Sequence, residues 1–451
     1  MPALALPRQQ SMPRPEPPVA SLFERFASMR AWLIVVSVSA VLGVVLSRSA
    51  ALATVHLLAT VGAVIAVGSL SKRPDLILAV TVYGGLSDVL WRSASARGPW
   101  EAGKYVVIIG CLLLTVRFVR RPKNLVLCVG MILLLLPSVL PALFELPFGR
   151  ARSVILASLN GPIAIPIAYL ACSNLRVTAR EMRGIYLIAL SPIVSICAVA
   201  TMATATSTSL DFGTQSNFAT SGGFGPNQVS SVLCVGALLC ILVTLQRGVN
   251  WAYRAAALAT AVWLAGQAVL TFSRGGIVGL VVACGAVGLV ALGTAGQRWR
   301  VLVAAGVLIV VALQVMSWAG TLTGGASEER FGDTDTSNRV TIAESDLRLF
   351  GSNPIAGVGV GMALYKRDID LYTSPHTEFT RLLAEHGVLG LAVIGLMVVM
   401  CVRIVRGGHG WYRMASVGLL AITIAQMGHS ATKIASIPIA FGLAALLEDP
   451  E

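Results

Sequence analysis

The chain has five histidines, and His376 has the setting that best suits proton transfer. Only His376 and His386 lie in the long polar segment 319–387. A Ser-Pro pair precedes His376, which predicts that this residue lies in the first turn of a helix. The positive end of a helix disfavours a protonated ring, so we expect a neutral imidazole near pH 7 that accepts a proton. Glu378 points away from that ring along a helix, so the two need not pair. A histidine without a catalytic role is the alternative.

Arg274 is the second candidate, in the sequence Phe272-Ser273-Arg274-Gly275-Gly276. This short segment joins two apolar runs and leaves no room for a real loop. A charge near membrane depth is costly and usually faces a cavity or a partner. A planar guanidinium suits phosphate oxygens, which predicts an anion clamp. An arginine that reaches lipid headgroups is the other interpretation.

Arg339 and Arg348 lie in a predicted helix at 339–350. Taken alone, both are interpreted as solvated surface arginines.

We expect no cofactor and no metal. Asp333-Thr334-Asp335 has a D-x-D spacing that hard cations favour, but a solvated acidic patch is the simpler interpretation. Phosphate-cradling and zinc-protease motifs are absent. The eight cysteines lie in or beside apolar runs without a C-x-x-C pair, so the sequence predicts small buried side chains rather than a metal site or disulfides.

Membrane helices must position these residues. Of the 451 residues, 56% are apolar and only 12% are charged, with a mean hydropathy of +0.79. A soluble domain carries about 25% charged residues, so a soluble enzyme, a disordered chain and a disulfide scaffold are excluded. The apolar runs have the length of membrane helices rather than of barrel strands. The predicted fold class is an all-α polytopic membrane protein.

Twelve to fourteen spans are predicted, because the third and fourth runs are the least regular. They divide the chain into a leader (1–30), a transmembrane bundle (31–318), a large outer loop (319–387) and C-terminal transmembrane helices (388–451). The predicted spans are 31–46, 50–69, 76–90, 104–118, 125–143, 154–172, 185–203, 228–245, 255–272, 276–292, 301–318, 388–405, 412–427 and 434–447.

The leader holds six prolines and is predicted to be disordered. Phe23, Phe26 and Met29 recur at helical spacing, which indicates a short interfacial helix at its end. The net charge of +13 does not indicate nucleic acid, because Lys and Arg fall in short links between apolar runs. With both termini in the cytoplasm, twenty of the 34 lie inside and seven in short outer links. This topology places the loop 319–387 outside.

The outer loop has the pattern of an ordered segment. Val340, Ala343, Leu347 and Phe350 recur at helical spacing before Gly351, which predicts a helix and its C-cap. Gly357, Gly359 and Gly361 allow close packing or approach to a ligand. A second helix is predicted after the Ser-Pro pair, with Phe379, Leu382 and Leu383 on its apolar face and Gly387 at its end.

In this order, these motifs resemble the O-antigen ligase and O-antigen polymerase superfamily of bacterial envelope glycosyltransferases. The resemblance covers about residues 222–391. It rests on Arg274 with Ser273 before it, on Arg339, on Asn353-Pro354-Ile355-Ala356-Gly357-Val358-Gly359, on His376-Thr377-Glu378-Phe379 and on Leu382 to Gly390. Gly225-Pro226-Asn227 resembles the asparagine-bearing turn of that family.

The resemblance implies a helical membrane glycosyltransferase fold of the GT-C-like type in the bacterial inner membrane. It implies an undecaprenyl-pyrophosphate-linked glycan donor and a glycan or lipid acceptor at the periplasmic face. Arg274 and Arg339 would bind the pyrophosphate, and His376 would act at the acceptor hydroxyl. Candidate substrate contacts are Ser273, Asn227, Thr377, Glu378 and Arg348. Thr377 stands where many members have Asn, which leaves the role of that position open.

Two activities fit the resemblance. A polymerase extends a lipid-linked glycan, and a ligase attaches the finished glycan to lipid A core or protein; the motifs lean slightly to a polymerase. Other envelope assembly proteins are possible partners. A lipid-linked sugar flippase and an assembly scaffold are the alternatives from other classes, although polar chemistry gathers outside rather than at mid-membrane.

Overall fold

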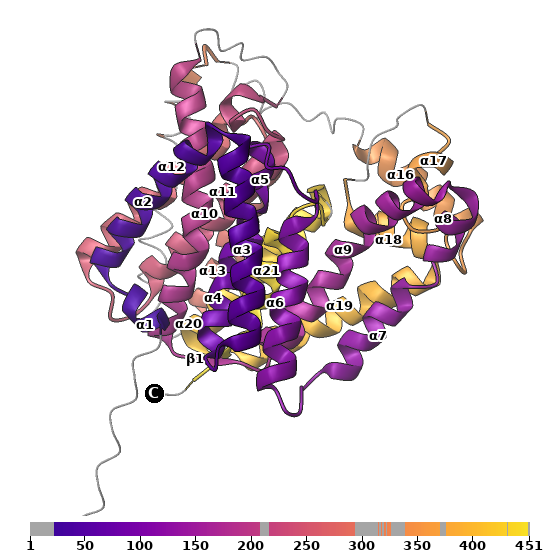
Figure 1. The fold of residues 1–451 in the computed structure, drawn as a ribbon, viewed down its shortest axis with the longest axis horizontal. Helices are drawn as coiled ribbons and strands as arrows, with labels where there is room; N and C mark the ends of the chain where they lie inside the picture. Colours follow the sequence, from indigo (N-terminus) through magenta and orange to yellow (C-terminus); the bar gives the residue numbers. More distant parts are fainter. Residues whose placement is uncertain are drawn as a thin grey trace, which may run out of the picture.

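The computed structural model describes residues 22–207, 216–293, 339–369, 376–430 and 432–449, and a few positions between 314 and 325. Helices dominate these ranges (Figure 1). In chain order they are α1 (Leu22–Phe26), α2 (Met29–Ser47), α3 (Ala50–Leu70), α4 (Pro74–Leu86), α5 (Asp88–Ser93), α6 (Ala102–Phe118), α7 (Leu125–Leu135), α8 (Val139–Glu145), α9 (Phe148–Cys172), α10 (Ala179–Thr206), the 3-10 helix η1 (Ala219–Ser221), α11 (Pro226–Leu245), α12 (Trp251–Leu270), α13 (Arg274–Leu292), α16 (Arg339–Ser352), α17 (Ala363–Lys366), α18 (Glu378–His386), α19 (Val388–Gly407), α20 (Gly410–Ser430) and α21 (Ser436–Ala444).

The predicted all-α membrane fold is confirmed. Eight segments of the described chain are long and apolar enough to cross a membrane by length and composition. The total number of spans stays a prediction. Three predictions fall outside the described residues. They concern the leader up to residue 21, the span 301–318 except for isolated positions, and Asp333-Thr334-Asp335.

Two predicted spans are interrupted. The run 76–90 divides at Ser87 into α4 and the short α5, and the run 125–143 divides into α7 and α8. Pro137 lies at the second break, where a residue without a backbone N–H cannot continue the helix. The last predicted span, 434–447, contains only the nine-residue α21.

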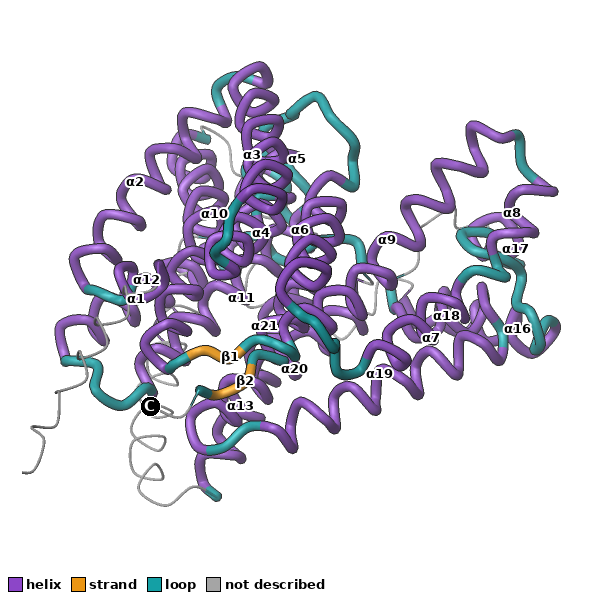
Figure 2. Tube along the Cα trace, turned by 60° about the horizontal axis from the view of Figure 1, so that its bottom comes forward, coloured by secondary structure: helices purple, strands orange, loops and turns teal. Residues whose placement is uncertain are grey.

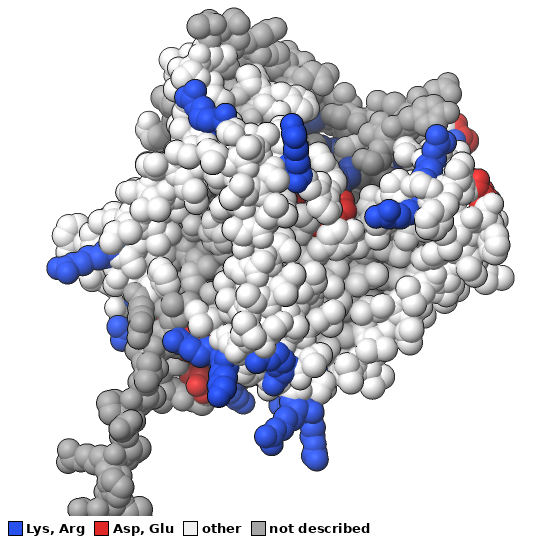
Figure 3. Space-filling view, in the orientation of Figure 1, with Lys and Arg blue, Asp and Glu red and all other residues white. Residues whose placement is uncertain are grey.

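The burial pattern is that of a bundle surrounded by an apolar solvent. Almost every residue of α11 is buried, which makes it a central helix. The outer faces of α2, α3 and α7 expose large apolar side chains, among them Val41 (64%), Val55 (63%) and Val126 (86%). Figure 3 shows Lys and Arg gathered at the lower edge of the molecule and more scattered in its upper part, whereas the surface between them, over the middle of α3 and α6, is uncharged. A lipid bilayer can surround such a band, because the backbone polar groups of helices are hydrogen-bonded within each helix.

The two ends of the described chain meet at this lower edge. Strand β1 (Arg176–Val177) pairs in parallel with β2 (Leu447–Glu448) (Figure 2). Helix α10 follows β1 directly and begins with a capping box formed by Thr178 and Glu181. Phe23 of α1 is buried, and its backbone lies against Gly184 of α10. The short helix expected after the leader is therefore packed on the bundle.

Helices α7, α8 and α16–α19 form an arm beside the main bundle in both ribbon views (Figures 1 and 2). The three glycines after α16 have positive φ, and a Cβ on Gly357 would lie 2.4 Å from the backbone of Glu385. Val358 N–H donates to the carbonyl of Ala384 at 2.9 Å. Gly357 therefore allows close packing against α18, whereas a Cβ on Gly359 would meet Pro141 of α8 and one on Gly361 would meet Val154 of α9.

The predicted helix at 339–350 is confirmed as α16, but its predicted face and C-cap were wrong. Val340 and Leu347 are about half exposed, and Ile342, Ser345 and Asp346 are buried instead. Asp346 accepts from Arg367 and from Thr380, so polar bonds rather than apolar contacts hold this face. The helix continues through Gly351 to Ser352.

Candidate functional site

The turn that carries Arg274 is fixed by buried hydrogen bonds. Helix α12 ends at Leu270 and α13 begins at Arg274, so three residues make the connection. Phe272 is fully buried with φ of 56°, a conformation that costs a non-glycine residue about 1–3 kcal/mol. The Ser273 hydroxyl donates to the side-chain oxygen of Asn227 at 2.7 Å. Two predicted substrate contacts, Ser273 and Asn227, therefore bond to each other and hold the start of α13.

The two glycines after Arg274 allow α13 to approach its neighbours. A Cβ on Gly276 would lie 2.3 Å from the hydroxyl oxygen of Ser230 in α11. A Cβ on Gly275 would lie 2.4 Å from Nδ1 of His429, near the end of α20. Arg274 directly precedes Gly275, so its backbone lies one residue away from the contact with the His429 ring.

His376 also contacts His429. Its ring forms a hydrogen bond with the backbone of His429. The predicted helix position of His376 was wrong, because α18 begins at Glu378 with Thr377 as its N-cap residue. Burial, followed by the charges of Lys433 and Arg339, lowers the pKa of His376 to about 4. The imidazole is therefore neutral near pH 7, but burial rather than a helix dipole is the main cause.

Glu378 anchors α18 to the turn between α20 and α21. One carboxylate oxygen accepts from the backbone N–H of Thr432 at 2.9 Å and from the Thr432 hydroxyl at 3.1 Å. The other accepts from Arg381. With 1% of its surface exposed, Glu378 is placed to position His376 through the start of α18.

A second buried carboxylate lies further along α18. Glu385 is 3.8 Å from Arg381, and burial raises the pKa of Glu385 to about 7. This carboxyl group therefore titrates near neutral pH on the same helix that Glu378 begins.

Lys433 adds a cation beside His376. Burial lowers the pKa of Lys433 to about 8, and the neighbouring charges of Arg381 and Arg339 act in the same direction. The Lys433 carbonyl accepts from Arg92 of α5 at 3.2 Å, and Arg92 also donates to the side chain of Gln228 at 3.2 Å. Gln228 lies in the first turn of α11, next to Asn227, so Arg92 links the Lys433 backbone to that turn.

The structure thus brings together most of the predicted residues. Arg339 starts α16 close enough for its charge to lower the pKa of His376. Thr377 is half-buried at the start of α18. Arg348 lies apart, with a side chain that is 54% exposed and paired with Asp368 at 3.1 Å.

Sequence reasoning missed His429 and Lys433. Neither ring nitrogen of His429 has a side-chain hydrogen-bond partner among the described residues. Both residues lie in Gly428-His429-Ser430-Ala431-Thr432-Lys433, a polar run between the last two apolar segments. This run lies outside the long loop, which is why sequence reasoning did not select it. The available signal was a third outer histidine four residues before a lysine.

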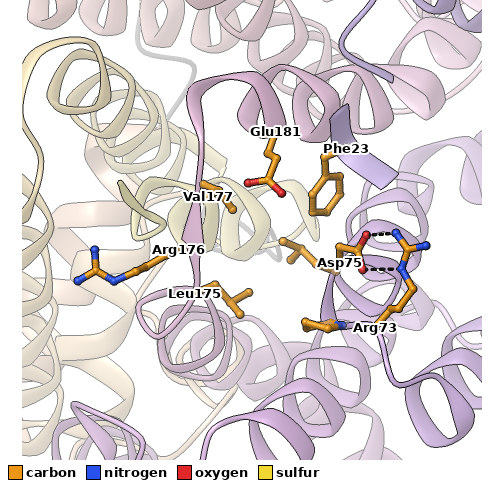
Figure 4. Close-up of a pocket in the computed structure, with 9 residues that line it drawn as sticks. Phe23, Arg73, Asp75, Leu175, Arg176, Val177 and Glu181 are labelled. Atoms are coloured by element: carbon orange, nitrogen blue, oxygen red, sulfur yellow. Dashed lines mark hydrogen bonds and ion pairs between the residues drawn. The ribbon is translucent and has the colours of Figure 1, made fainter. Parts of the chain in front are cut away.

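A cavity lies away from these residues, at the lower edge of the molecule. It measures about 530 Å³ and is lined by α1, the start of α4, β1 and α10 (Figure 4). Its carboxylates are already engaged, because Asp75 pairs with Arg73 at 2.6 Å and Glu181 caps α10. None of the predicted site residues lines this cavity.

The arrangement around His376 combines a neutral base with cations from separate elements. Such a site can accept a proton from a hydroxyl while fixed positive charge stabilises a departing phosphate. In the described ranges, no group of three His, Cys, Asp or Glu side chains has a geometry suited to a metal ion.

Part of the chain is similar to a known protein family. Residues 259–395 match the O-antigen ligase family, a stretch that runs from α12 through the Arg274 turn and α16 to α18 and the start of α19. No curated protein matches the chain. The chain has the apolar helices of a multi-pass membrane protein, and its residues 259–395 are similar to the O-antigen ligase family, which supports the O-antigen ligase and O-antigen polymerase superfamily.

Proposed function

We propose that this protein is a membrane glycosyltransferase that moves a glycan from undecaprenyl pyrophosphate to an acceptor sugar hydroxyl. The observation that carries the proposal is the neutral His376 ring, bonded to the backbone of His429 beside Lys433 and Arg339. His429 in turn packs against the residue that follows Arg274.

In the proposed reaction, the acceptor oxygen attacks the anomeric carbon and the bond from that carbon to the phosphate oxygen breaks. His376 takes the hydroxyl proton as the new bond forms. The electron pair of the broken bond stays on the pyrophosphate, where Arg274, Arg339 and Lys433 stabilise the negative charge. Direct attack inverts the anomeric centre. Three cations supply the charge stabilisation that a metal gives other transferases, so we expect activity in excess chelator.

The expected orientation has both termini in the cytoplasm and α16 and α18 at the outer face of the inner membrane. The distribution of Lys and Arg along the chain supports it. Apolar grooves between spans would hold the polyprenyl tail. Substituted-cysteine labelling tests the orientation: a single cysteine introduced at exposed Arg150 should react with an impermeant maleimide in intact spheroplasts, and one at exposed Arg176 should not.

The function is tested in a deletion strain of the native host. Lipid-linked glycans are extracted and sized by mass spectrometry. Accumulated single repeat units would show that polymerisation is missing, which is the activity the sequence motifs slightly favour. Accumulated long chains with none on the final acceptor would show that ligation is missing. A lipid-linked pool equal to the parent in size and amount would contradict both and favour a flippase or scaffold.

A further inference from the structure

A small cavity adjoins the site and is not used by the proposed chemistry. It measures about 270 Å³ and is lined by Asp88 and Arg92 of α5, by Trp100 and by Ala102 at the start of α6. Pockets for drug-sized ligands measure about 300–1,000 Å³, so this volume suits one monosaccharide ring.

The cavity is polar on one side and aromatic on the other. Trp100 is 59% exposed, and the Arg92 guanidinium carbon lies 4.8 Å from the centre of its ring. The ring of Phe224, in the segment that leads into α11, lies 6.0 Å from that of Trp100. A sugar ring presents C–H groups on its faces and hydroxyls at its edge, which an indole and a guanidinium complement.

Arg92 is built into this wall rather than lying free on the surface. Its side chain is 4% exposed and lies 2.9 Å from the Asp88 carboxylate. Asp88 also accepts from the backbone of Ala435 at 3.2 Å. The Nε of Arg92 has no hydrogen-bond partner among the described residues, which leaves a buried donor at the cavity unmatched.

The same arginine connects the cavity to the site. One Arg92 nitrogen donates both to the Lys433 carbonyl and to the side chain of Gln228. Lys433 is one of the two cations that lower the pKa of His376. A ligand in the cavity therefore lies beside the turn that positions the proposed base.

We propose that this cavity is a sugar subsite that binds one ring of the glycan substrate against Trp100 and Arg92. The inference rests on the proposed transferase function, because it takes the ligand to be the glycan that is transferred or extended. A ring of the donor and a ring of the acceptor share this chemistry.

The test uses the full chain in nanodiscs and the repeat-unit oligosaccharide released by mild acid from the lipid-linked pool of the deletion strain. Binding of this oligosaccharide is measured by saturation-transfer NMR and by titration in a His376→Ala background, without lipid-linked donor, so that turnover does not compete with binding. We expect Trp100→Ala to weaken binding by about tenfold or more. Trp100→Phe should retain most of the binding, because it keeps an aromatic face.

Trp251→Ala is the matched control. Trp251 is 82% exposed at the start of α12 and is a membrane-interface tryptophan outside the cavity. If Trp100 served only as such an anchor, both alanine variants would bind the oligosaccharide like the parent, which would overturn the proposal. Absence of oligosaccharide binding to the parent protein would overturn it as well.

Transfer assays with Trp100→Ala distinguish the source of the ring. A raised KM for the lipid-linked donor assigns the ring to the donor, and a raised KM for the acceptor assigns it to the acceptor. An unchanged KM for both would contradict the proposal. A different result would contradict the proposed transferase mechanism and leave the sugar subsite standing: His376→Ala would transfer glycan like the parent while the oligosaccharide still bound at Trp100.

Discussion

The His429 ring occupies the space next to Gly275, where any side chain would collide with it. A Cβ at position 275 would lie 2.4 Å from Nδ1 of His429. This contact joins the first turn of α13 to the end of α20. The position of Arg274 relative to His376 therefore depends on a glycine.

Substitution Gly275→Ala should displace the ring or the helix start. We expect an overpacking cost of about 1–3 kcal/mol and a large loss of transfer, because the cations and the base move apart. Thermal unfolding in detergent and transfer rates measure the two effects. Gly285→Ala is the control, since it lies on the same helix with nothing within 4 Å of the added Cβ. Equal behaviour of the two variants would show that the Gly275 contact is unimportant.

Substitution of His376 should remove the proposed base without unfolding the protein. General base catalysis contributes about 10²–10⁴-fold, so we expect His376→Ala to lose transfer by that factor. The half-buried ring is not part of the main apolar core, so expression and the unfolding temperature should stay close to the parent. His409→Ala, in the link between α19 and α20, is the control and should transfer glycan like the parent. A His376→Ala protein with parental rates would remove the proposed mechanism.

Arg274 is expected to act through the planar fork of its guanidinium. Arg274→Lys keeps the charge but loses two-point contact with phosphate oxygens, so transfer should fall by about ten- to a hundredfold with little change in stability. Arg150→Lys, an exposed position at the start of α9, serves as the control. If Arg274→Lys matched Arg150→Lys, a general positive charge would suffice at this position.

The dependence of kcat/KM on pH should reflect Lys433 at alkaline pH and His376 at acidic pH. The Lys433 amine has a pKa lowered to about 8, so it is charged below that pH and loses its charge above it. We expect kcat/KM to fall above about pH 8, and Lys433→Arg to remove that fall because an arginine stays charged. The pKa of His376, lowered to about 4, predicts that activity is retained at pH 6 and falls only toward pH 4.

Glu385 also titrates in this range, with a pKa of about 7. Glu385→Gln is therefore the control for the alkaline limb, which should persist in that variant. If the fall in activity at alkaline pH were unchanged in Lys433→Arg but lost in Glu385→Gln, the titrating group would be the Glu385 carboxylate of α18 rather than Lys433.

The membrane fold could be predicted from the sequence because apolar runs of span length carry the information locally. Interruptions such as that at Ser87 could not, since the apolar run resumes at Val89 after the single charge of Asp88, and packing decides where the helix stops. The Arg274 turn was found because charge, shortness and two glycines coincide within five residues.

The rest of the site depends on contacts between distant segments. His429 and Lys433 act on His376 across more than fifty positions of sequence, and no local pattern encodes that distance. The first turn of α18 shows the same limit. A Ser-Pro pair is a good helix start, but the helix begins at Glu378, whose carboxylate is held by Thr432 and Arg381.

That anchoring makes Glu378 a separate test of how the loop is held. Glu378→Gln removes a buried charge from Arg381 and places an amide N–H₂ where a carboxylate oxygen accepted hydrogen bonds. We expect a loss of about 1–3 kcal/mol in stability. Transfer should fall as well, because His376 is two residues away and loses its fixed position, while the pH at which activity falls in acid should shift. Glu344→Gln, exposed on α16, is the control and should change neither quantity. A Glu378→Gln protein with lower stability but a parental rate and pH profile would show that Glu378 holds α18 without positioning the base.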